Sequence, residues 1–143
     1  MTHDIQIREI KETDANSIVE LSEQLGYTIE TSIVSDQISN ILSNKNHFCF
    51  VATNNKKVIG FIHGFLAIRL TSPPFMEIAG LIVSEDFRNI GIGSKLVRHI
   101  ESLYTECAST RVRCNVKRSE AHKFYLNLGY SDKKVQNVFE KRK

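Results

Sequence analysis

One segment of the sequence places a cation and two glycines at fixed spacing directly after an apolar strand. In "LIVSEDFRNIGIGSKL", Arg88 stands three residues before Gly91, and Gly93 follows after one intervening residue. Glycines let an anion approach the main chain without meeting a Cβ. The first N–H groups of a helix lack partners within it, and the helix dipole adds positive charge there. The spacing therefore predicts a cradle for a diphosphate-like anion at the start of a helix.

Two familiar phosphate-binding turns do not fit this segment. A dinucleotide-binding turn needs a third glycine three residues after the second, where this chain has Leu96. A P-loop needs a lysine directly after its second glycine, and Ser94 separates Gly93 from Lys95. The pattern that does fit is [RQ]-x-x-G-x-[GA] after an apolar strand.

A second segment, "AHKFYLNLGY" from Ala121 to Tyr130, fits the pattern A-x-x-[FLY]-Y-x-x-x-G-[FY]. Together the two segments resemble the GNAT superfamily of N-acetyltransferases, in which the first pattern holds the pyrophosphate of acetyl-coenzyme A. The resemblance covers nearly the whole chain, because the expected order of elements also matches. It implies an acyltransferase (EC 2.3.1.-) with acetyl-CoA as acyl donor and no metal. The chain departs from the family at Asn89, where glycine is frequent, and at Arg118, where asparagine is frequent.

The resemblance also implies which residues hold the cofactor. The strand that ends at residues 81–83 would splay from its neighbour, and its free backbone groups would pair with the pantetheine arm. Gly80 is consistent with a bulge in that strand, although relief of crowding would explain it equally well. Asn115 would replace the asparagine contact that position 118 lacks. The implied cofactor-binding residues are Leu81, Ile82, Val83, Arg88, Asn89, Ile90, Gly91, Ile92, Gly93, Ser94 and Asn115.

Two side chains are candidates for acid–base catalysis. Tyr125 matches the family's tyrosine that donates a proton or hydrogen bond to the departing thiolate, whereas periodicity alone would place it in a buried helix stripe. Glu77 looks equivalent to the general base of histone-acetylating members. In an alternating strand it would share a face with Leu81, and burial would raise its pKa; a structural carboxylate is the alternative. The secondary candidates for proton transfer are His47, His63 and His122.

The periodicity of apolar residues predicts the elements that must position these groups. Strands are expected at residues 5–10, 47–53, 58–68, 75–83 and 111–116, with two short strands at 130–134 and 137–142. Helices are expected at 13–26, 34–42, 119–129 and from near Gly91 to Cys107, and the tandem prolines of "RLTSPP" are expected to lie outside any strand. This order predicts one α/β N-acetyltransferase domain over residues 1–143, with a GNAT-like, mixed, mostly antiparallel sheet of about seven strands and about four helices.

Composition limits the partners and the compartment. The 143 residues carry a net charge of +3 and 24% charged side chains. No apolar run approaches the roughly 20 residues of a membrane span, and three cysteines without metal-ligand spacing suggest reduced thiols in a cytoplasmic protein. The charge is modest and no recognition-helix signature accompanies it, which argues against nucleic acid. Exposed edge strands at the C-terminus would be compatible with a homodimer.

These residues predict transfer of an acetyl group to a primary amine of a small molecule or peptide. Direct attack in a ternary complex is expected, because no cysteine is placed as an obvious covalent intermediate. The segments at residues 26–32 and 69–75 would shape the acceptor pocket, without distinguishing an aminoglycoside, a polyamine, an amino acid or a protein N-terminus. The alternative is a non-catalytic acyl-CoA sensor or scaffold, against which the intact Tyr125 and Glu77 argue.

Overall fold

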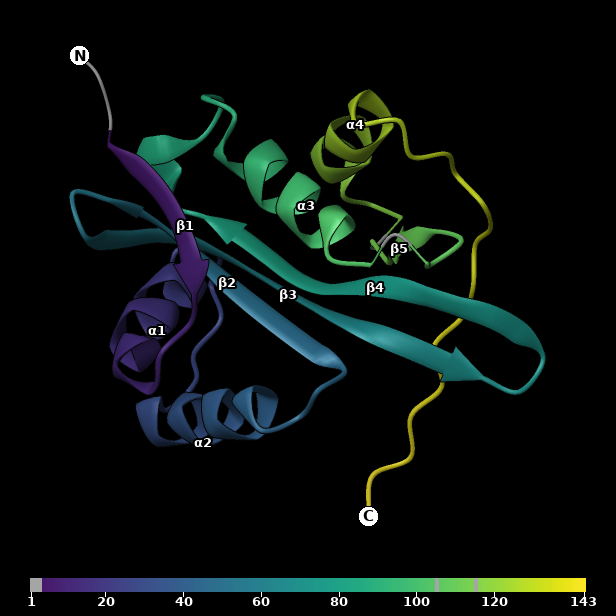
Figure 1. Ribbon diagram of the computed structural model, residues 1–143, viewed down its shortest axis with the longest axis horizontal. Helices are drawn as coiled ribbons and strands as arrows, with labels where there is room; N and C mark the ends of the chain where they lie inside the picture. The colour runs from purple at the N-terminus through teal and green to yellow at the C-terminus, as the bar shows by residue number, and fades with distance from the viewer. Residues whose placement is uncertain (1–3, 105, 115) are drawn as a thin grey trace. The chain divides into compact units, whose positions relative to one another are not determined.

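The computed structural model describes residues 4–104, 106–114 and 116–143. The chain divides into two compact units, Met1–Val112 and Arg113–Lys143. The first unit contains, in chain order, β1 (Ile5–Glu9), α1 (Ala15–Glu23), α2 (Thr31–Leu42), β2 (His47–Asn54), β3 (Lys57–Arg69), β4 (Ser72–Val83), α3 (Ile92–Ser102) and β5 (Thr110–Val112), with short 3-10 turns η1 (Glu12–Asp14) and η2 (Glu85–Phe87) (Figure 1). The second unit contains α4 (Ser119–Asn127).

The sheet of the first unit has the strand order β1-β2-β3-β4-β5. Strands β1 to β4 are antiparallel neighbours, and β5 joins β4 in parallel. Helices α1 and α2 cover one face of this sheet and α3 covers the other (Figure 1). The expected mixed, mostly antiparallel sheet with four helices is confirmed.

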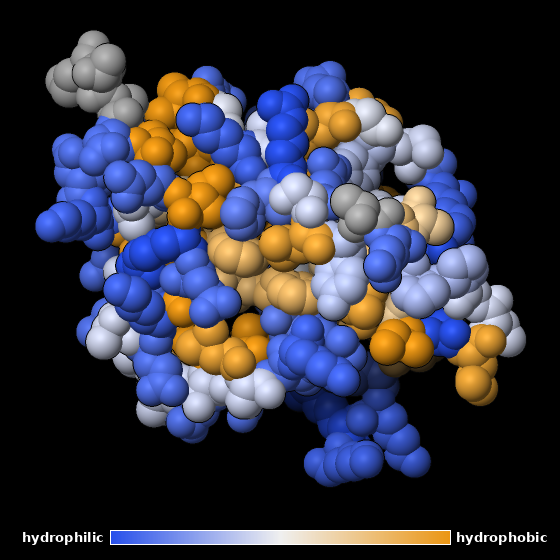
Figure 2. All heavy atoms as spheres, viewed as in Figure 1, coloured by the Kyte–Doolittle hydropathy of each residue, from blue (hydrophilic) through white to orange (hydrophobic). Residues whose placement is uncertain are grey.

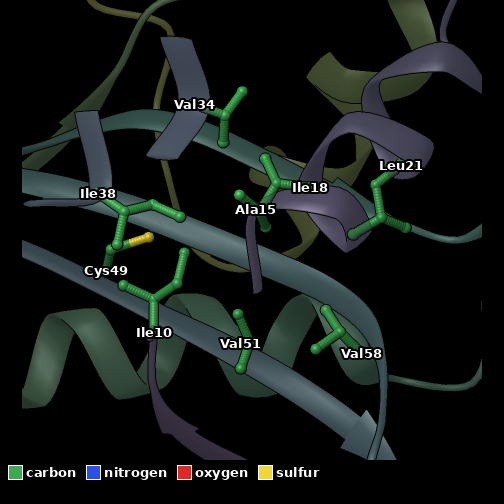
Figure 3. Packing of buried hydrophobic residues seen from close by; sticks show 9 residues of the cluster. All are labelled: Ile10, Ala15, Ile18, Leu21, Val34, Ile38, Cys49, Val51 and Val58. Carbon is green, nitrogen blue, oxygen red and sulfur yellow. The ribbon is translucent and has the colours of Figure 1, made fainter. Parts of the chain in front are cut away.

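The two faces of the sheet are packed by helix stripes with a 3.6-residue period. On the α3 face, Leu96, Val97 and Ile100 are buried. Gly64 lets this helix approach β3 closely, since an added Cβ would lie 2.9 Å from Ile100 Cδ1. On the other face, Figure 3 shows one contiguous cluster formed by Ile10, Ala15, Ile18, Leu21, Val34, Ile38, Cys49, Val51 and Val58.

A partly buried ion pair between Arg8 and Asp14 fixes the entry into α1. Both oxygens of Asp14 accept hydrogen bonds from the Arg8 guanidinium at 2.9 Å, and the Lys11 amide donates to the same carboxylate at 2.8 Å. Burial by itself would raise the pKa of Asp14, but the hydrogen bonds from Arg8 and Lys11 outweigh it and hold the pKa below its ordinary value. Helix α1 accordingly begins at Ala15, two residues later than its predicted start.

The prediction of about seven strands was wrong, because the described residues form a sheet of five strands and residues 130–143 form none. The apolar side chains of this segment are too few and too exposed to drive pairing, with Val135, Val138 and Phe139 at 74%, 86% and 92% exposure. The expected homodimer depended on edge strands in this segment, so its structural premise is absent.

The placement of the tandem prolines outside any strand was also wrong. Pro73 and Pro74 lie near the beginning of β4. The register of β3 and β4 shifts between the pairs Ala67–Phe75 and Arg69–Ser72. The prolines therefore fall in the irregular part of the ladder, where the missing N–H is tolerated.

The surface shown in Figure 2 is mainly hydrophilic, with separate apolar patches between the charged side chains. No helix in the described part of the chain combines the length and apolar character that crossing a bilayer requires.

Candidate active site

The turn from β4 into α3 has the backbone that its sequence predicted. Asn89 has φ 64° and Gly91 has φ 88°, both in the left-handed region. Asparagine is one of the few residues other than glycine that tolerate this conformation. The first helical hydrogen bond of α3 runs from the Lys95 amide to the Gly91 carbonyl at 3.1 Å. The amides of residues 92–94 precede that bond, so they have no acceptor within the helix.

The space beside Gly91 is open. A Cβ added there would meet no atom within 4 Å, so the backbone angle and not crowding requires glycine. The Gly93 position lies inside α3, where glycine leaves the approach to the helix amides free of a Cβ. An open helix start with positive partial charge fits the diphosphate of a nucleotide cofactor.

Two side chains fix the loop that precedes this turn. Arg88 donates from Nε to the Val83 carbonyl at 3.2 Å, and its side chain is exposed. Gln24, directly after α1, accepts a hydrogen bond from the Glu85 amide at 2.9 Å and contacts Ser84 Oγ at 3.4 Å. Sequence reasoning missed Gln24, because nothing local connects it to a loop about sixty residues away.

Strand β4 contains the bulge that Gly80 suggested. The pair His63–Gly80 is followed by Gly64–Ile78, so Ala79 is an extra residue in β4. An added Cβ at Gly80 would come only to 3.6 Å from Phe61 Cε2, an ordinary contact, so crowding does not explain this glycine.

The edge of β4 beyond the bulge is not paired with β5. The two strands pair only at positions 76–78 of β4, and no other described strand continues the ladder toward residue 83. The expected divergence of this strand end from its neighbour stays a prediction, because β5 ends at Val112, where the first unit ends. Backbone groups at residues 79–83 are placed where an extended ligand could add to the sheet.

The bulge overturns the expected orientation of Glu77. Glu77 pairs with Phe65, and His63, two residues earlier in β3, pairs with Gly80. Paired residues share a face, and residues two apart in a strand point the same way, so Phe65 and His63 share one face of β3. Glu77 therefore lies on the same face as Gly80 and His63, toward α1 and α2. The extra residue turns Leu81 to the opposite face, against the prediction that it accompanies Glu77.

The neighbours of Glu77 include a cation that sequence reasoning did not consider. Arg111 of β5 is its register partner on the side opposite β3. The Arg111 guanidinium lies 3.9 Å from the centroid of the Phe75 ring, and Phe75 precedes Glu77 by two residues on the same face. Glu77 is half-buried and its side chain interacts with other residues of the protein, so a structural role and a catalytic role both fit its position.

Two histidines form a pair on the same face as Glu77. His47 Nδ1 and His63 Nε2 are 2.9 Å apart, and the rings stack with centroids separated by 5.2 Å. Burial, reinforced by the nearby His47, lowers the pKa of His63 to about 4. Within the described residues, no three His, Cys, Asp or Glu side chains are grouped as metal ligands would be.

In the second unit, Tyr125 lies on α4 between two aromatic rings. Its ring centroid is 5.0 Å from that of Phe124 and 5.5 Å from that of Tyr130. Burial, with a smaller contribution from Cys114, raises the pKa of Tyr125 to about 12. The phenol is therefore a hydrogen-bond donor throughout the neutral range. Asn115 lies outside the described residues, so its expected cofactor contact stays a prediction.

Comparisons with known proteins agree with this arrangement. Residues 13–130 match the model of the Acetyltransferase (GNAT) family. An uncharacterized N-acetyltransferase of Chlorobaculum tepidum is 31% identical over 129 residues, covering 90% of this chain and 77% of the relative. The aminoalkylphosphonate N-acetyltransferase of Salmonella typhimurium is 32% identical over 95 residues, covering 64% of this chain and 61% of the relative.

The fold also matches solved structures. The aminoglycoside N-acetyltransferase AAC(6')-Iy, solved in complex with CoA, superposes with a TM-score of 0.87 at 19% identity, covering 99% of this chain and 97% of that one. At this identity the match supports the fold alone. The glycine turn and the family match agree on acetyl-CoA as the acyl donor. The chain belongs to the GNAT family of acetyltransferases.

Proposed function

We propose that this protein transfers the acetyl group of acetyl-CoA to a primary amine of a small molecule or peptide, by direct attack while both substrates are bound. The two units would serve as one N-acetyltransferase domain, since the family match spans residues 13–130. The observation that carries the proposal is the turn into α3, where Gly91 at φ 88° opens onto free space ahead of the helix amides.

The donor would extend from that turn along the edge of β4 that β5 leaves unpaired. The amides of residues 92–94 would hold the pyrophosphate, and Arg88 would add a cation beside it. Backbone groups at residues 81–83 would pair with the pantetheine arm, as an added strand pairs with a sheet edge. An amide near the Ala79 bulge would polarise the thioester carbonyl.

Tyr125 and Glu77 are the proposed acid and base. A phenol whose pKa is raised to about 12 stays protonated, so Tyr125 would donate to the departing thiolate. Glu77 lies on the same face as Gly80, which follows the bulge residue Ala79, and is close in register to the proposed thioester position. It would accept the amine proton directly or through a water molecule.

The cysteines support direct transfer over a covalent acyl-enzyme. Burial, with the charges of Asp14 and Glu9, raises the pKa of Cys49 to about 12. Burial also raises the pKa of Cys107 and of Cys114. A thiol with a raised pKa contains little nucleophilic thiolate at neutral pH. The free state of all three thiols also supports the proposed cytoplasmic location.

The decisive test measures release of CoA thiol from acetyl-CoA with a panel of amines, in the wild type and in Tyr125→Phe. We expect amine-dependent thiol release, and a fall in kcat of about a hundredfold in the variant. The dissociation constant of acetyl-CoA should be unchanged, which serves as the folding control. Tight acetyl-CoA binding without turnover across the panel would refute catalysis and favour a sensor.

A further inference from the structure

A pocket of about 360 Å³ lies between α2 and the strands β2 and β3, a volume within the range of small-molecule sites. Its wall on the α2 side is formed by amide side chains and one apolar residue, and its wall on the sheet side by two histidines. None of its described lining residues is Asp, Glu, Lys or Arg; they are Gln37, Asn40, Ile41, Asn44, His47 and His63.

This pocket shares a sheet face with the proposed point of acyl transfer. His63 lines the pocket and pairs across β3 and β4 with Gly80, next to the bulge. His47 also lines it and pairs with Phe65, which in turn pairs with Glu77. His47 and Glu77 therefore flank Phe65 across the sheet, and His63 lies two residues before Phe65 in β3. All of them lie on the face that α1 and α2 cover.

The histidine pair offers hydrogen bonds with no fixed charge on His63. One ring donates and the other accepts across the 2.9 Å contact. His63, with its pKa lowered to about 4, is neutral at physiological pH. A neutral imidazole carries one N–H and one lone pair. Asn40 and Gln37 add amide donors and acceptors, and their side chains are hydrogen-bonded to each other at 3.0 Å.

We propose that this pocket binds the acetyl acceptor and selects a weakly basic amine carried on a hydroxyl-rich small molecule. The inference rests on the proposed function, whose acceptor it specifies. The reacting nitrogen meets the carboxylate of Glu77, but the described lining residues include no other carboxylate. Any further ammonium group of the acceptor would therefore lose hydration that no opposite charge replaces. An anionic group likewise finds no lysine or arginine among the described lining residues. Hydroxyls and a neutral amine instead match amide and imidazole partners.

The proton balance favours an acceptor that is neutral on entry. The ammonium form loses one proton to solvent, and the neutral nitrogen attacks the thioester carbonyl. The C–N bond forms and the C–S bond breaks; the nitrogen passes its surplus proton to Glu77, and the sulfur takes a proton from Tyr125. Both residues then exchange protons with water, so each turnover releases one proton overall. Electron-withdrawing hydroxyls lower an amine's pKa and so increase its neutral fraction.

The first experiment compares three acceptors through the rate of thiol release. Glucosamine is a weakly basic, hydroxyl-rich amine, sisomicin is a polycation, and aminoethylphosphonate carries an anion. We expect kcat/KM for glucosamine to exceed both others by about tenfold. A preference for sisomicin or the phosphonate would overturn the inference but leave the proposed function standing. Transfer to no amine at all would refute the proposed function, and this inference with it.

The second experiment changes the charge of the pocket. Asn40→Asp places a carboxylate in the lining, and Ser39→Asp places the same charge on the neighbouring exposed position of α2, outside the lining. We expect Asn40→Asp to lower KM for sisomicin by about fivefold, the upper end for a partly exposed ion pair, with no change for Ser39→Asp. Equal effects of the two substitutions would overturn the inference.

A third variant tests the histidine directly. His63→Gln keeps a donor and an acceptor but cannot reproduce the ring contact with His47. We expect KM for glucosamine to rise about fivefold, while the dissociation constant of acetyl-CoA stays at its wild-type value. An unchanged KM would show that the pocket does not hold the acceptor. Asn40 is exposed, so its variant tests the pocket even if His63→Gln destabilises the fold.

Discussion

Substituting alanine for Gly91 separates the backbone role of this glycine from its role toward the cofactor. Gly91 and Gly26 have nearly the same backbone, with φ +88° and +84°, and a Cβ at either would meet nothing within 4 Å. A left-handed conformation costs an L-residue about 1–2 kcal/mol. For a chain of this size the cost lowers Tm by about 3–6 °C. We expect this loss for both Gly91→Ala and Gly26→Ala.

Only the first of these substitutions should affect the cofactor. The Cβ at position 91 would occupy open space at the start of α3, directly before the amides of residues 92–94 that would hold the pyrophosphate. Loss of one charge-assisted hydrogen bond to the pyrophosphate costs about 1.5–3 kcal/mol, which raises the dissociation constant of CoA about 10- to 100-fold. Isothermal calorimetry with CoA, at one fixed salt concentration, measures this effect for both variants.

Two outcomes for the Gly91→Ala and Gly26→Ala variants would contradict this prediction. If Gly91→Ala bound CoA as tightly as the wild type, while both variants lost the same Tm, the start of α3 would not hold the pyrophosphate. If Gly26→Ala weakened CoA binding equally, the effect would be a general consequence of lower stability.

Three further predictions follow from contacts within each unit. Because the pKa of Tyr125 is raised to about 12, the phenol keeps its proton below that pH. We therefore expect kcat not to fall on the alkaline side before about pH 11. A fall of kcat near pH 9 that vanishes in Tyr125→Phe would contradict this. Gln24→Ala removes the contacts to Ser84 and Glu85, and should raise KM for acetyl-CoA several-fold at a stability cost of about 1 kcal/mol in urea unfolding. Asp14→Asn should cost about 1–2 kcal/mol at pH 7. Since the folded pKa of Asp14 is lowered, its contribution is present above the ordinary value of 3.8 and lost as the pH falls through the folded value, so the variant's stability should change less in acid.

The parts of the site that lie close together in the sequence could be predicted from it. Arg88, Gly91 and Gly93 belong to one turn, where backbone angles and helix geometry are local properties. The divergence of the β4 edge was implied by the family resemblance and stays a prediction; β4 pairs with β5 only at residues 76–78.

Features that depend on register or on distant contacts could not be predicted in this way. Gly80 indicated a bulge in β4 but not which residue would be the extra one; that residue is Ala79, and it reversed the face expected for Leu81 relative to Glu77. The contact of Gln24 with the loop after β4 depends on how α1 docks on the sheet. The apolar residues near Val138 resembled a strand, but pairing requires a neighbouring edge and burial that local sequence does not encode.

The location of α2 and α3 on opposite faces of the sheet has a kinetic consequence. The nucleotide cradle begins α3, whereas the histidine-lined pocket adjoins α2, so donor and acceptor would enter through separate openings. Neither would need to leave before the other arrives, which favours random-order kinetics. A dead-end ligand of the pocket should therefore inhibit noncompetitively with respect to acetyl-CoA.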